Sequence, residues 1–298
     1  MAMSTLQSVS SMSQHYRLIY VDETQQEQVA PLQDLITQHR LSLTLAPELI
    51  TDRLNQKRLQ QLSADSEQAV LLLDNKNQLS LLVDGLSVAP EWDKLQRRVV
   101  SAGRKSELLL QAAKITAYNQ VIDATAGFGH DSLILASTGA QVTMLEQQPI
   151  MALLLLVEHQ RMSLQPNWQK LMSRLHIINT DALEFFDNFK SHSKSIDGSS
   201  IDVIYLDPMF PEDSYQDRKT GKGAKVNKQM QALHQLAIPP TVEQEQQLLQ
   251  SAKAVIKNNE QQSGRVIVKR PVQAPVFANQ AADESWQNAA LRFDGYFI

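Results

Sequence analysis

The C-terminal two-thirds of the chain alternates short apolar segments with segments of helical periodicity, and this alternation most restricts what the chain can fold into. From about Ser101 onward, runs of apolar residues suited to strands are separated by runs whose apolar positions recur at helical spacing. Such alternation predicts right-handed βαβ units and a parallel sheet with helices on both faces. The sequence therefore predicts an α/β fold of the doubly wound type.

The predicted elements of this region follow one another at short intervals. We expect strands over residues 121–123, 141–146, 175–179, 203–206, 265–269 and 291–298. We expect helices over residues 107–117, 130–137, 149–164, 182–189 and 241–257. Ligands of doubly wound sheets bind beyond the carboxyl ends of the strands, so the residues directly after these strands are candidates for a binding site.

The first hundred residues show a different pattern. A polar leader over residues 1–15 is followed by an expected strand over 16–22, a helical segment over 24–40 and a hairpin formed by 69–74 and 79–84. We therefore expect a small α/β domain over residues 16–100 and a larger domain over residues 101–298.

Composition excludes several classes of protein. The chain of 298 residues has no cysteine, which rules out a disulfide scaffold, thiolate zinc sites and a cysteine nucleophile. Its apolar runs are far shorter than the ~18–20 residues of a membrane span, and the leader lacks a secretory signal pattern. We expect a soluble, cytoplasmic protein that does not contact a membrane.

A glycine-bearing segment, Asp123-Ala-Thr-Ala-Gly-Phe-Gly-His-Asp131, directly follows the first strand of the larger domain. Glycine lets a ligand approach the backbone because it has no Cβ and tolerates positive φ. We take Asp123, Gly127 and Gly129 as candidates for cofactor contact, with an ordinary βα turn as the alternative. The dinucleotide-binding fingerprint is incomplete, because Ser132 stands where its third glycine would fall.

Acidic residues follow the next two strands. Glu146 ends the strand over 141–146, close to the interval of about 20 residues at which an acidic residue meets ribose hydroxyls. Asp181 follows the strand over 175–179 and could accept a hydrogen bond from an adenine amino group. Alternatively, Thr180 or Asp181 caps the following helix, a role compatible with ligand contact.

The segment Tyr205-Leu-Asp-Pro-Met-Phe-Pro211 ends the fourth strand. It resembles the Asp-Pro-Pro-Tyr-type motif of S-adenosylmethionine-dependent methyltransferases that act on exocyclic amines of bases. In that chemistry Asp207 would hold the amine hydrogens, and Phe210 would offer an aromatic face on which a flipped base can stack. We therefore predict Asp207 and Phe210 as catalytic residues.

Two basic clusters are candidates for contact with a polyanion. The net charge of −4 does not favour a nucleic-acid binder, but local clusters can still attract a polyanion. A solvated surface is the alternative for both. The clusters comprise Arg97, Arg98, Arg104 and Lys105 before the glycine segment, and Arg218, Lys219, Lys222, Lys225 and Lys228 after Asp207.

Five segments, in one order, resemble the RsmJ family of small-subunit ribosomal RNA guanine-N2 methyltransferases, over roughly residues 95–298. They are residues 123–131, 144–146, 205–211, 268–271 and 292–294. The sequence departs from the family pattern at His130 and at Gln147, where an arginine is usual. The resemblance implies a Rossmann-like class I methyltransferase fold. It also implies S-adenosylmethionine binding, without a metal, by His130, Asp131, Glu146, Gln147, Thr180, Asp181 and Asp207.

The resemblance further implies a function and a partner. The enzyme would methylate the N2 amine of a guanine in small-subunit ribosomal RNA, free or in the assembled subunit, and release S-adenosylhomocysteine. Lys269 and Arg270 would meet RNA phosphates together with the basic clusters. Two alternatives are a catalytically silent RNA-binding or ribosome-assembly factor on the same fold and an NAD(P)-dependent oxidoreductase. The missing third glycine and the Asp-Pro-Met-Phe segment both weigh against the oxidoreductase.

Overall fold

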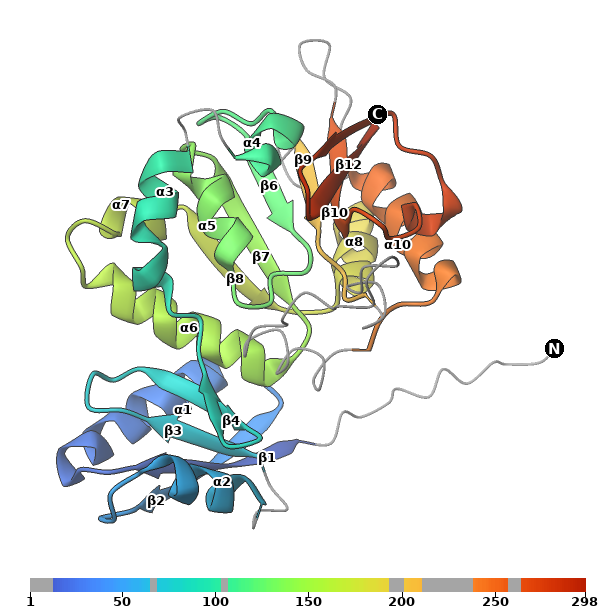
Figure 1. Ribbon diagram of the computed structural model, residues 1–298. Helices are drawn as coiled ribbons and strands as arrows, with labels where there is room; N and C mark the ends of the chain where they lie inside the picture. The colour runs from blue at the N-terminus through green and yellow to red at the C-terminus, as the bar shows by residue number, and fades with distance from the viewer. Residues whose placement is uncertain (1–12, 65–68, 103–106, 193–200, 211–237, 257–263) are drawn as a thin grey trace. The chain divides into compact units, whose positions relative to one another are not determined.

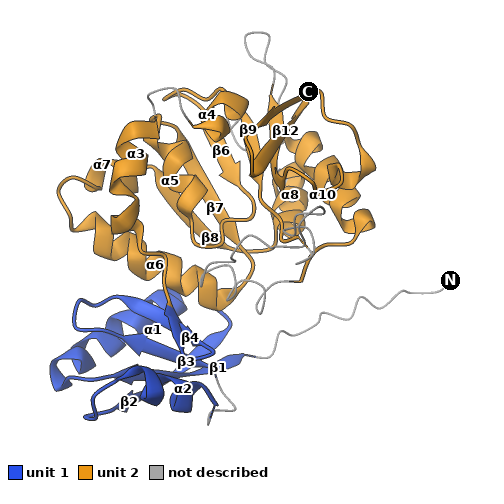
Figure 2. Ribbon diagram, viewed as in Figure 1, with its two compact units in different colours: residues 1–87 blue, residues 88–298 orange. Residues whose placement is uncertain are grey.

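The computed structural model describes residues 13–64, 69–102, 107–192, 201–210, 238–256 and 264–298 (Figure 1). The chain divides into two compact units, residues 1–87 and 88–298 (Figure 2). This division precedes the boundary expected near residue 100, because the segment from Val88 through the first helices after it belongs to the larger unit.

The smaller unit is a five-stranded sheet in the order β2-β1-β3-β4-β5. Its elements are β1 (Gln14–Tyr20), η1 (Glu23–Gln28), α1 (Val29–Gln38), β2 (Leu43–Leu49), α2 (Gln56–Ala64), β3 (Val70–Leu73), β4 (Leu79–Val83) and β5 (Leu86–Val88). The hairpin expected around residue 76 is present as β3 and β4. Sequence analysis missed β2, which lies at the sheet edge and contains Pro47, a residue that cannot donate to a central ladder.

The larger unit is a seven-stranded sheet in the order β11-β12-β10-β9-β6-β7-β8. Its strands are β6 (Gln120–Asp123), β7 (Gln141–Glu146), β8 (Leu175–Asn179), β9 (Val203–Leu206), β10 (Arg265–Pro271), β11 (Glu284–Gln287) and β12 (Leu291–Phe297). Its helices are η2 (Trp92–Leu95), α3 (Gln96–Ala102), α4 (Leu108–Ala113), α5 (His130–Ser137), α6 (Pro149–Ser163), α7 (Gln169–Met172), α8 (Ala182–His192), α10 (Val242–Val255) and η4 (Phe277–Asn279).

The expectation of a parallel sheet is correct for five strands and wrong for two. The strands β10, β9, β6, β7 and β8 pair in parallel, whereas β12 is antiparallel to both β10 and β11. A parallel partner needs a long crossover, but β11 and β12 are joined only by residues 288–290. The chain order reverses between β6 and β9, and the carboxyl ends of the strands at such a switch point form a ligand-binding crevice.

Helices cover the sheet and fix its crevice in place. On one face, Ile122, Ile204 and Val266 of the strands belong to a buried core that includes Phe186 of α8 and Leu249 of α10. Figure 1 shows α3 and α5 away from α8 and α10, across the sheet. Among the residues that the structure describes, no helix combines the length and apolar character needed to cross a membrane.

The turn between β6 and α5 requires glycine at position 129. Gly129 has a φ of 74°, a left-handed conformation that side chains rarely adopt. An added Cβ would lie 2.6 Å from the Met144 Cε atom and 2.9 Å from a ring carbon of Trp92. Gly129 therefore serves the turn and the packing beneath it.

Candidate active site

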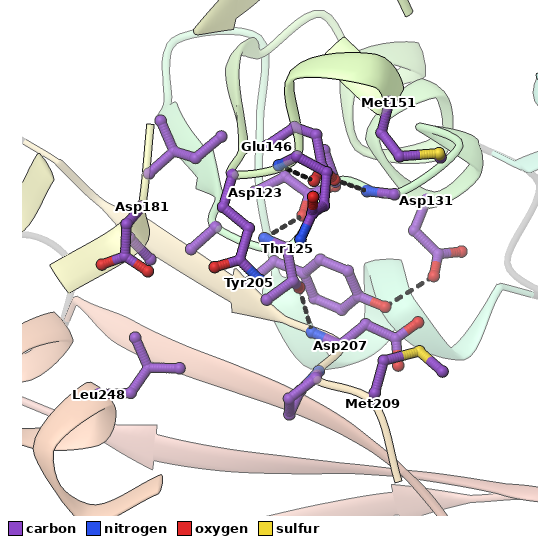
Figure 3. A pocket seen from close by; sticks show the side chains of 18 of the residues that line it. Asp123, Thr125, Asp131, Glu146, Met151, Asp181, Tyr205, Asp207, Met209 and Leu248 are labelled. Atoms are coloured by element: carbon purple, nitrogen blue, oxygen red, sulfur yellow. Dashed lines mark hydrogen bonds between the residues drawn. The ribbon is translucent and has the colours of Figure 1, made fainter. Parts of the chain in front are cut away.

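A cavity of about 470 Å³ opens at the carboxyl ends of β6, β7, β8, β9 and β10 (Figure 3). It lies at the switch point of the sheet, where the topology favours a ligand. The cavity is lined by most of the residues expected to contact a cofactor, namely Asp123, Gly127, His130, Asp131, Glu146, Gln147, Thr180, Asp181 and Asp207. Gly129, also expected there, does not line it.

Glu146 is held rigidly at the end of β7. Its Oε2 accepts a hydrogen bond from the Gly127 backbone N–H at 3.0 Å, and its Oε1 accepts one from the Gln148 backbone N–H at 2.8 Å. Burial raises the pKa of Glu146 to about 7, although these N–H groups act in the opposite direction. Glu146 is thus a fixed carboxylate that titrates near neutral pH.

Asp123 maintains the shape of the glycine segment. Its Oδ2 accepts a hydrogen bond from the Ser132 hydroxyl, and its Oδ1 accepts one from the Thr125 backbone N–H at 3.2 Å. Burial raises the pKa of Asp123 to about 7. Ser132, which replaces the third glycine of the dinucleotide fingerprint, is therefore a buried partner of this carboxyl group.

Asp181 has the capping role that the sequence allowed for Thr180 or Asp181. Its Oδ1 accepts hydrogen bonds from the backbone N–H groups of Leu183 at 2.8 Å and Glu184 at 3.2 Å, so it caps α8. It also lines the cavity. Figure 3 shows Asp181 at one end of the cavity and Asp131 at the other, with Glu146 between them.

The end of the cavity opposite Asp181 holds a network of charged groups. The Nζ atom of Lys269 lies 2.7 Å from Asp131 Oδ2 and 2.8 Å from Asp207 Oδ2. The Tyr205 hydroxyl donates to the same Asp131 oxygen at 2.7 Å. Arg98 lies 3.5 Å from the other oxygen of Asp131. Two acidic groups and two basic groups therefore meet around one tyrosine.

The pKa values of these groups follow from burial and from their mutual charges. Burial alone would raise the pKa of Asp131, but the charge and hydrogen bond of Lys269, the Tyr205 hydroxyl and the charge of Arg98 together outweigh it and leave a pKa of about 2. Burial raises the pKa of Asp207 above its usual value, Lys269 opposes this rise, and the charge on Asp131 adds to it. Burial would lower the pKa of Lys269, but the two carboxylates raise it above its usual value. Lys269 is accordingly a permanent cation.

The backbone next to Asp207 is tied to the glycine segment. The Asp207 N–H donates to the Thr125 hydroxyl at 2.6 Å. Sequence reasoning did not single out Thr125, and no local pattern marks it, because its partner is supplied by a distant strand. The apolar lining residues Met151, Met209 and Leu248 were missed as well, since their sequence patterns match those of ordinary core residues.

His130 does not present a free imidazole to the cavity. Its Nε2 lies 2.8 Å from the Pro90 carbonyl oxygen, to which the neutral ring donates. Burial lowers the pKa of His130, which keeps the ring neutral. The ring also stacks on Phe128, with centroids 6.1 Å apart.

The structure corrects the expectations for Phe210 and Arg270. Phe210 is buried, is not part of the cavity wall, and lies 4.6 Å below the guanidinium of Arg270, so it offers no free face to a base. Arg270 is also buried and donates to Glu245 Oε1 at 3.0 Å, so it cannot meet RNA phosphates. Successive side chains of a strand point to opposite faces, so Lys269 and Arg270 cannot share one role.

The remaining basic candidates are placed differently from one another. Lys269 lies in the cavity wall, paired with two carboxylates, rather than on a surface open to phosphates. Arg98 also lines the cavity and makes a bidentate contact with Glu107, at 2.9 and 3.0 Å. Arg97 is exposed. The others, Arg104, Lys105, Arg218, Lys219, Lys222, Lys225 and Lys228, lie outside the described residues.

The cavity offers hydrogen-bond acceptors in a row. Within the described ranges, no three histidine or acidic side chains are placed to hold a metal ion. Carboxylates at Asp181, Glu146 and Asp207 can accept hydrogen bonds from amino and hydroxyl groups of one elongated ligand. The arrangement therefore favours a nucleoside-like ligand with a reacting group near Asp207.

Comparisons with known proteins agree with this geometry. A family model described as "Putative SAM-dependent methyltransferase" matches residues 48–298. Ribosomal RNA small subunit methyltransferase J of Psychrobacter cryohalolentis is 68% identical over 296 residues, covering 99% of this chain and 100% of the relative. The protein of the same name from Acinetobacter baumannii (strain ACICU) is 34% identical and covers 94% of this chain and 93% of its own length.

A solved structure extends the likeness to three dimensions. The crystal structure of a SAM-dependent methyltransferase from Neisseria gonorrhoeae superposes with a TM-score of 0.63 at 27% sequence identity, covering 94% of this chain and 95% of that one. The expected Rossmann-like class I fold is confirmed, and S-adenosylmethionine is the cofactor of the matched family. The oxidoreductase and the catalytically silent factor find no support among these relatives. The chain belongs to the S-adenosylmethionine-dependent methyltransferases, in the family of ribosomal RNA small subunit methyltransferase J.

Proposed function

We propose that this protein transfers a methyl group from S-adenosylmethionine to the N2 amine of a guanine in small-subunit ribosomal RNA. The names of its relatives support the RNA, and the resemblance of its motifs to guanine-N2 methyltransferases supports the base. The observation that best supports an amine as the methyl acceptor is the position of the Asp207 carboxylate. It follows β9 and lines the same cavity as Glu146 and Asp181.

The cavity residues fit S-adenosylmethionine. Glu146 can accept hydrogen bonds from both ribose hydroxyls, and Asp181 can accept one from the adenine amino group. Asp131 is the candidate for the amino group of the methionine part. When bound, the cofactor supplies a methyl group on a sulfonium sulfur, and the new N–C bond forms as the S–C bond breaks to leave S-adenosylhomocysteine.

The residues of the chain contribute alignment and electrostatics. A guanine amine is a poor nucleophile because its lone pair is delocalised into the ring, so fixing it in line with the methyl group is the main catalytic need. Asp207 accepts a hydrogen bond from the amine and stabilises the positive charge that develops there. Thr125 holds the backbone of Asp207 in place.

The proposal is tested by identifying the methylated product. Unmodified small subunits and, separately, naked small-subunit RNA are incubated with the protein and a methyl-labelled donor, then digested and analysed by mass spectrometry. We expect one labelled N2-methylguanosine. Label on a ring nitrogen, a ribose hydroxyl or protein would refute the acceptor, and no transfer to either substrate would favour the catalytically silent factor.

Cofactor binding should depend on pH through Glu146. Because the pKa of Glu146 is raised to about 7, its carboxylate is ionised above that pH and protonated below it. The protonated form loses acceptor capacity, so the affinity for S-adenosylhomocysteine should fall about tenfold between about pH 8 and about pH 6. Calorimetric titrations across this range measure the effect.

The control for this pH dependence is Glu146→Gln, which keeps the size of the side chain but cannot titrate in this range. Asp123 has a similar pKa and remains in the variant, so the difference between the two proteins isolates Glu146. Equal pH dependence in both proteins would show that Glu146 is not the titrating group.

The second basic cluster should act on RNA binding and not on cofactor binding. Replacing Lys219, Lys222 and Lys225 with glutamine should weaken RNA binding and flatten its salt dependence. Each lost phosphate contact lowers the slope of log K against log salt by a little under one unit, about 0.7 to 0.9. The matched control replaces three exposed lysines elsewhere, Lys76, Lys94 and Lys170. Equal slopes in the two triple variants would indicate that the cluster is a solvated surface and does not contact RNA phosphates.

A further inference from the structure

Lys269 bridges two carboxylates that come from different parts of the fold. Its ammonium contacts Asp131, in the first turn of α5, and Asp207, directly after β9, at 2.7 and 2.8 Å. The Lys269 side chain is 21% exposed, and those of Asp131 and Asp207 are 12% and 30% exposed. The bridge is thus largely withdrawn from solvent. Charges shielded from water interact more strongly than charges in water.

The surroundings of Asp207 make Lys269 hard to replace. The negative charge of Asp131 raises the pKa of Asp207. The charge of an ionised Asp207 in turn raises the pKa values of Asp123 and Tyr205. Of the described residues, Arg98 is a second cation in this network, but it contacts the other oxygen of Asp131 and is also bound to Glu107. Among the described residues, Asp207 forms its ion pair with Lys269.

We propose that Lys269 is a positioning residue for methyl transfer: its ammonium keeps the Asp207 carboxylate ionised and oriented toward the cofactor site, and couples it to Asp131. This inference rests on the proposed function, in which Asp207 receives the guanine amine. The amine releases one proton when its nitrogen is methylated, and an ionised Asp207 can take up that proton. The role differs from a phosphate contact because it acts through Asp207 and not on the RNA backbone.

Lys269 should determine how the activity depends on pH. Burial and Asp131 both raise the pKa of Asp207, and Lys269 lowers it. When a neutral residue replaces Lys269, the pKa of Asp207 should rise further, so that a larger fraction of Asp207 is protonated and inactive at neutral pH. Raising the pH ionises Asp207 again, so the loss of activity should be largest at low pH and shrink as the pH increases.

The experiment measures single-turnover methyl transfer from about pH 6 to about pH 9 for the wild type, Lys269→Gln and Lys269→Arg. The variant rate is divided by the wild-type rate at each pH, which cancels titration of the RNA and the cofactor. For Lys269→Gln we expect this ratio to rise at least tenfold across the range, the change that one pKa unit produces in the ionised fraction. Lys269→Arg, which keeps the charge, should give a nearly flat ratio close to one.

Controls separate this role from other effects. Lys170→Gln, an exposed lysine of α7, should match the wild type at every pH. Affinity for S-adenosylhomocysteine and the thermal unfolding midpoint show whether each variant is folded. If Lys269→Gln does not fold, Lys269→Met serves as a second neutral variant.

Two outcomes would overturn the proposal. If the ratio of the Lys269→Gln rate to the wild-type rate does not change with pH, Lys269 has only a structural role. A higher KM for RNA with an unchanged kcat would make it a phosphate contact. The proposed function is tested separately, by identifying the product that the wild type forms. The ratio of variant rate to wild-type rate can be measured for whichever methyl transfer the wild type catalyses.

Discussion

Replacing Asp207 with asparagine should lower the turnover of methyl transfer at least ~100-fold, the scale seen when one electrostatic partner of a transition state is removed. The substitution preserves the size of the side chain but removes the negative charge that faces the amine. The fold should survive because the Asp207 side chain is 30% exposed and its backbone N–H still binds Thr125. Single-turnover rates with saturating cofactor measure the effect.

The matched control is Asp181→Asn, at the other end of the same cavity (Figure 3). If Asp181 receives the adenine amino group, this variant should weaken cofactor binding and leave the rate at saturating cofactor nearly unchanged. The two variants therefore divide the cavity into a binding end and a reacting end. Full activity of Asp207→Asn would contradict the mechanism, and equal losses of turnover in both variants would contradict the division.

A central strand of the site could be predicted because it is buried on both faces. Parallel strands covered by helices read as continuous apolar runs, and β9, which is buried throughout, occupies the predicted range 203–206. In contrast, β11 has the sequence Glu-Ser-Trp-Gln and is largely exposed, so no apolar pattern marks it. The antiparallel direction of β12 was missed because pairing direction depends on the connections, not on the composition of the strand.

The position of the site was predictable for a topological reason. Asp123, Glu146 and Asp207 each follow or end a parallel strand, and the carboxyl ends of these strands meet at one edge of the sheet. The finer roles were not predictable, because they depend on contacts between distant segments. Lys269 and Arg270 are adjacent in sequence and share a charge, yet one faces the cavity and the other faces the core.

The buried partner of Arg270 shows what a single sequence cannot reveal. Glu245 lies on α10, 25 residues before Arg270, and nothing local connects the two. Its Oε2 also accepts a hydrogen bond from the Ala278 backbone N–H at 2.8 Å, so it joins α10, β10 and η4. The Arg270 guanidinium is 4.6 Å from the Phe210 ring centroid and 5.4 Å from that of Phe277.

Replacing Glu245 with alanine should therefore destabilise the larger unit by ~3–5 kcal/mol, because it leaves the guanidinium of Arg270 buried without its counter-charge. The double variant Glu245→Leu with Arg270→Met removes both charges and should recover much of that loss, since an apolar pair of similar volume can substitute for a buried ion pair. A double-mutant cycle completed by the single variants Glu245→Leu and Arg270→Met separates the pair interaction from packing.

Tryptophan fluorescence during urea unfolding is a suitable measurement, because all three tryptophans, Trp92, Trp168 and Trp286, lie in residues 88–298. Lys94→Ala, which removes an exposed ion pair of the same unit with Glu91, should cost at most about 1 kcal/mol. A loss as small as this in Glu245→Ala would mean that the buried pair contributes little. A large loss should also reduce activity, because Arg270 packs on Phe210 and thereby supports the segment that begins at Asp207. The stability of the core and the orientation of the Asp207 carboxylate would then depend on the same buried pair, Glu245 and Arg270.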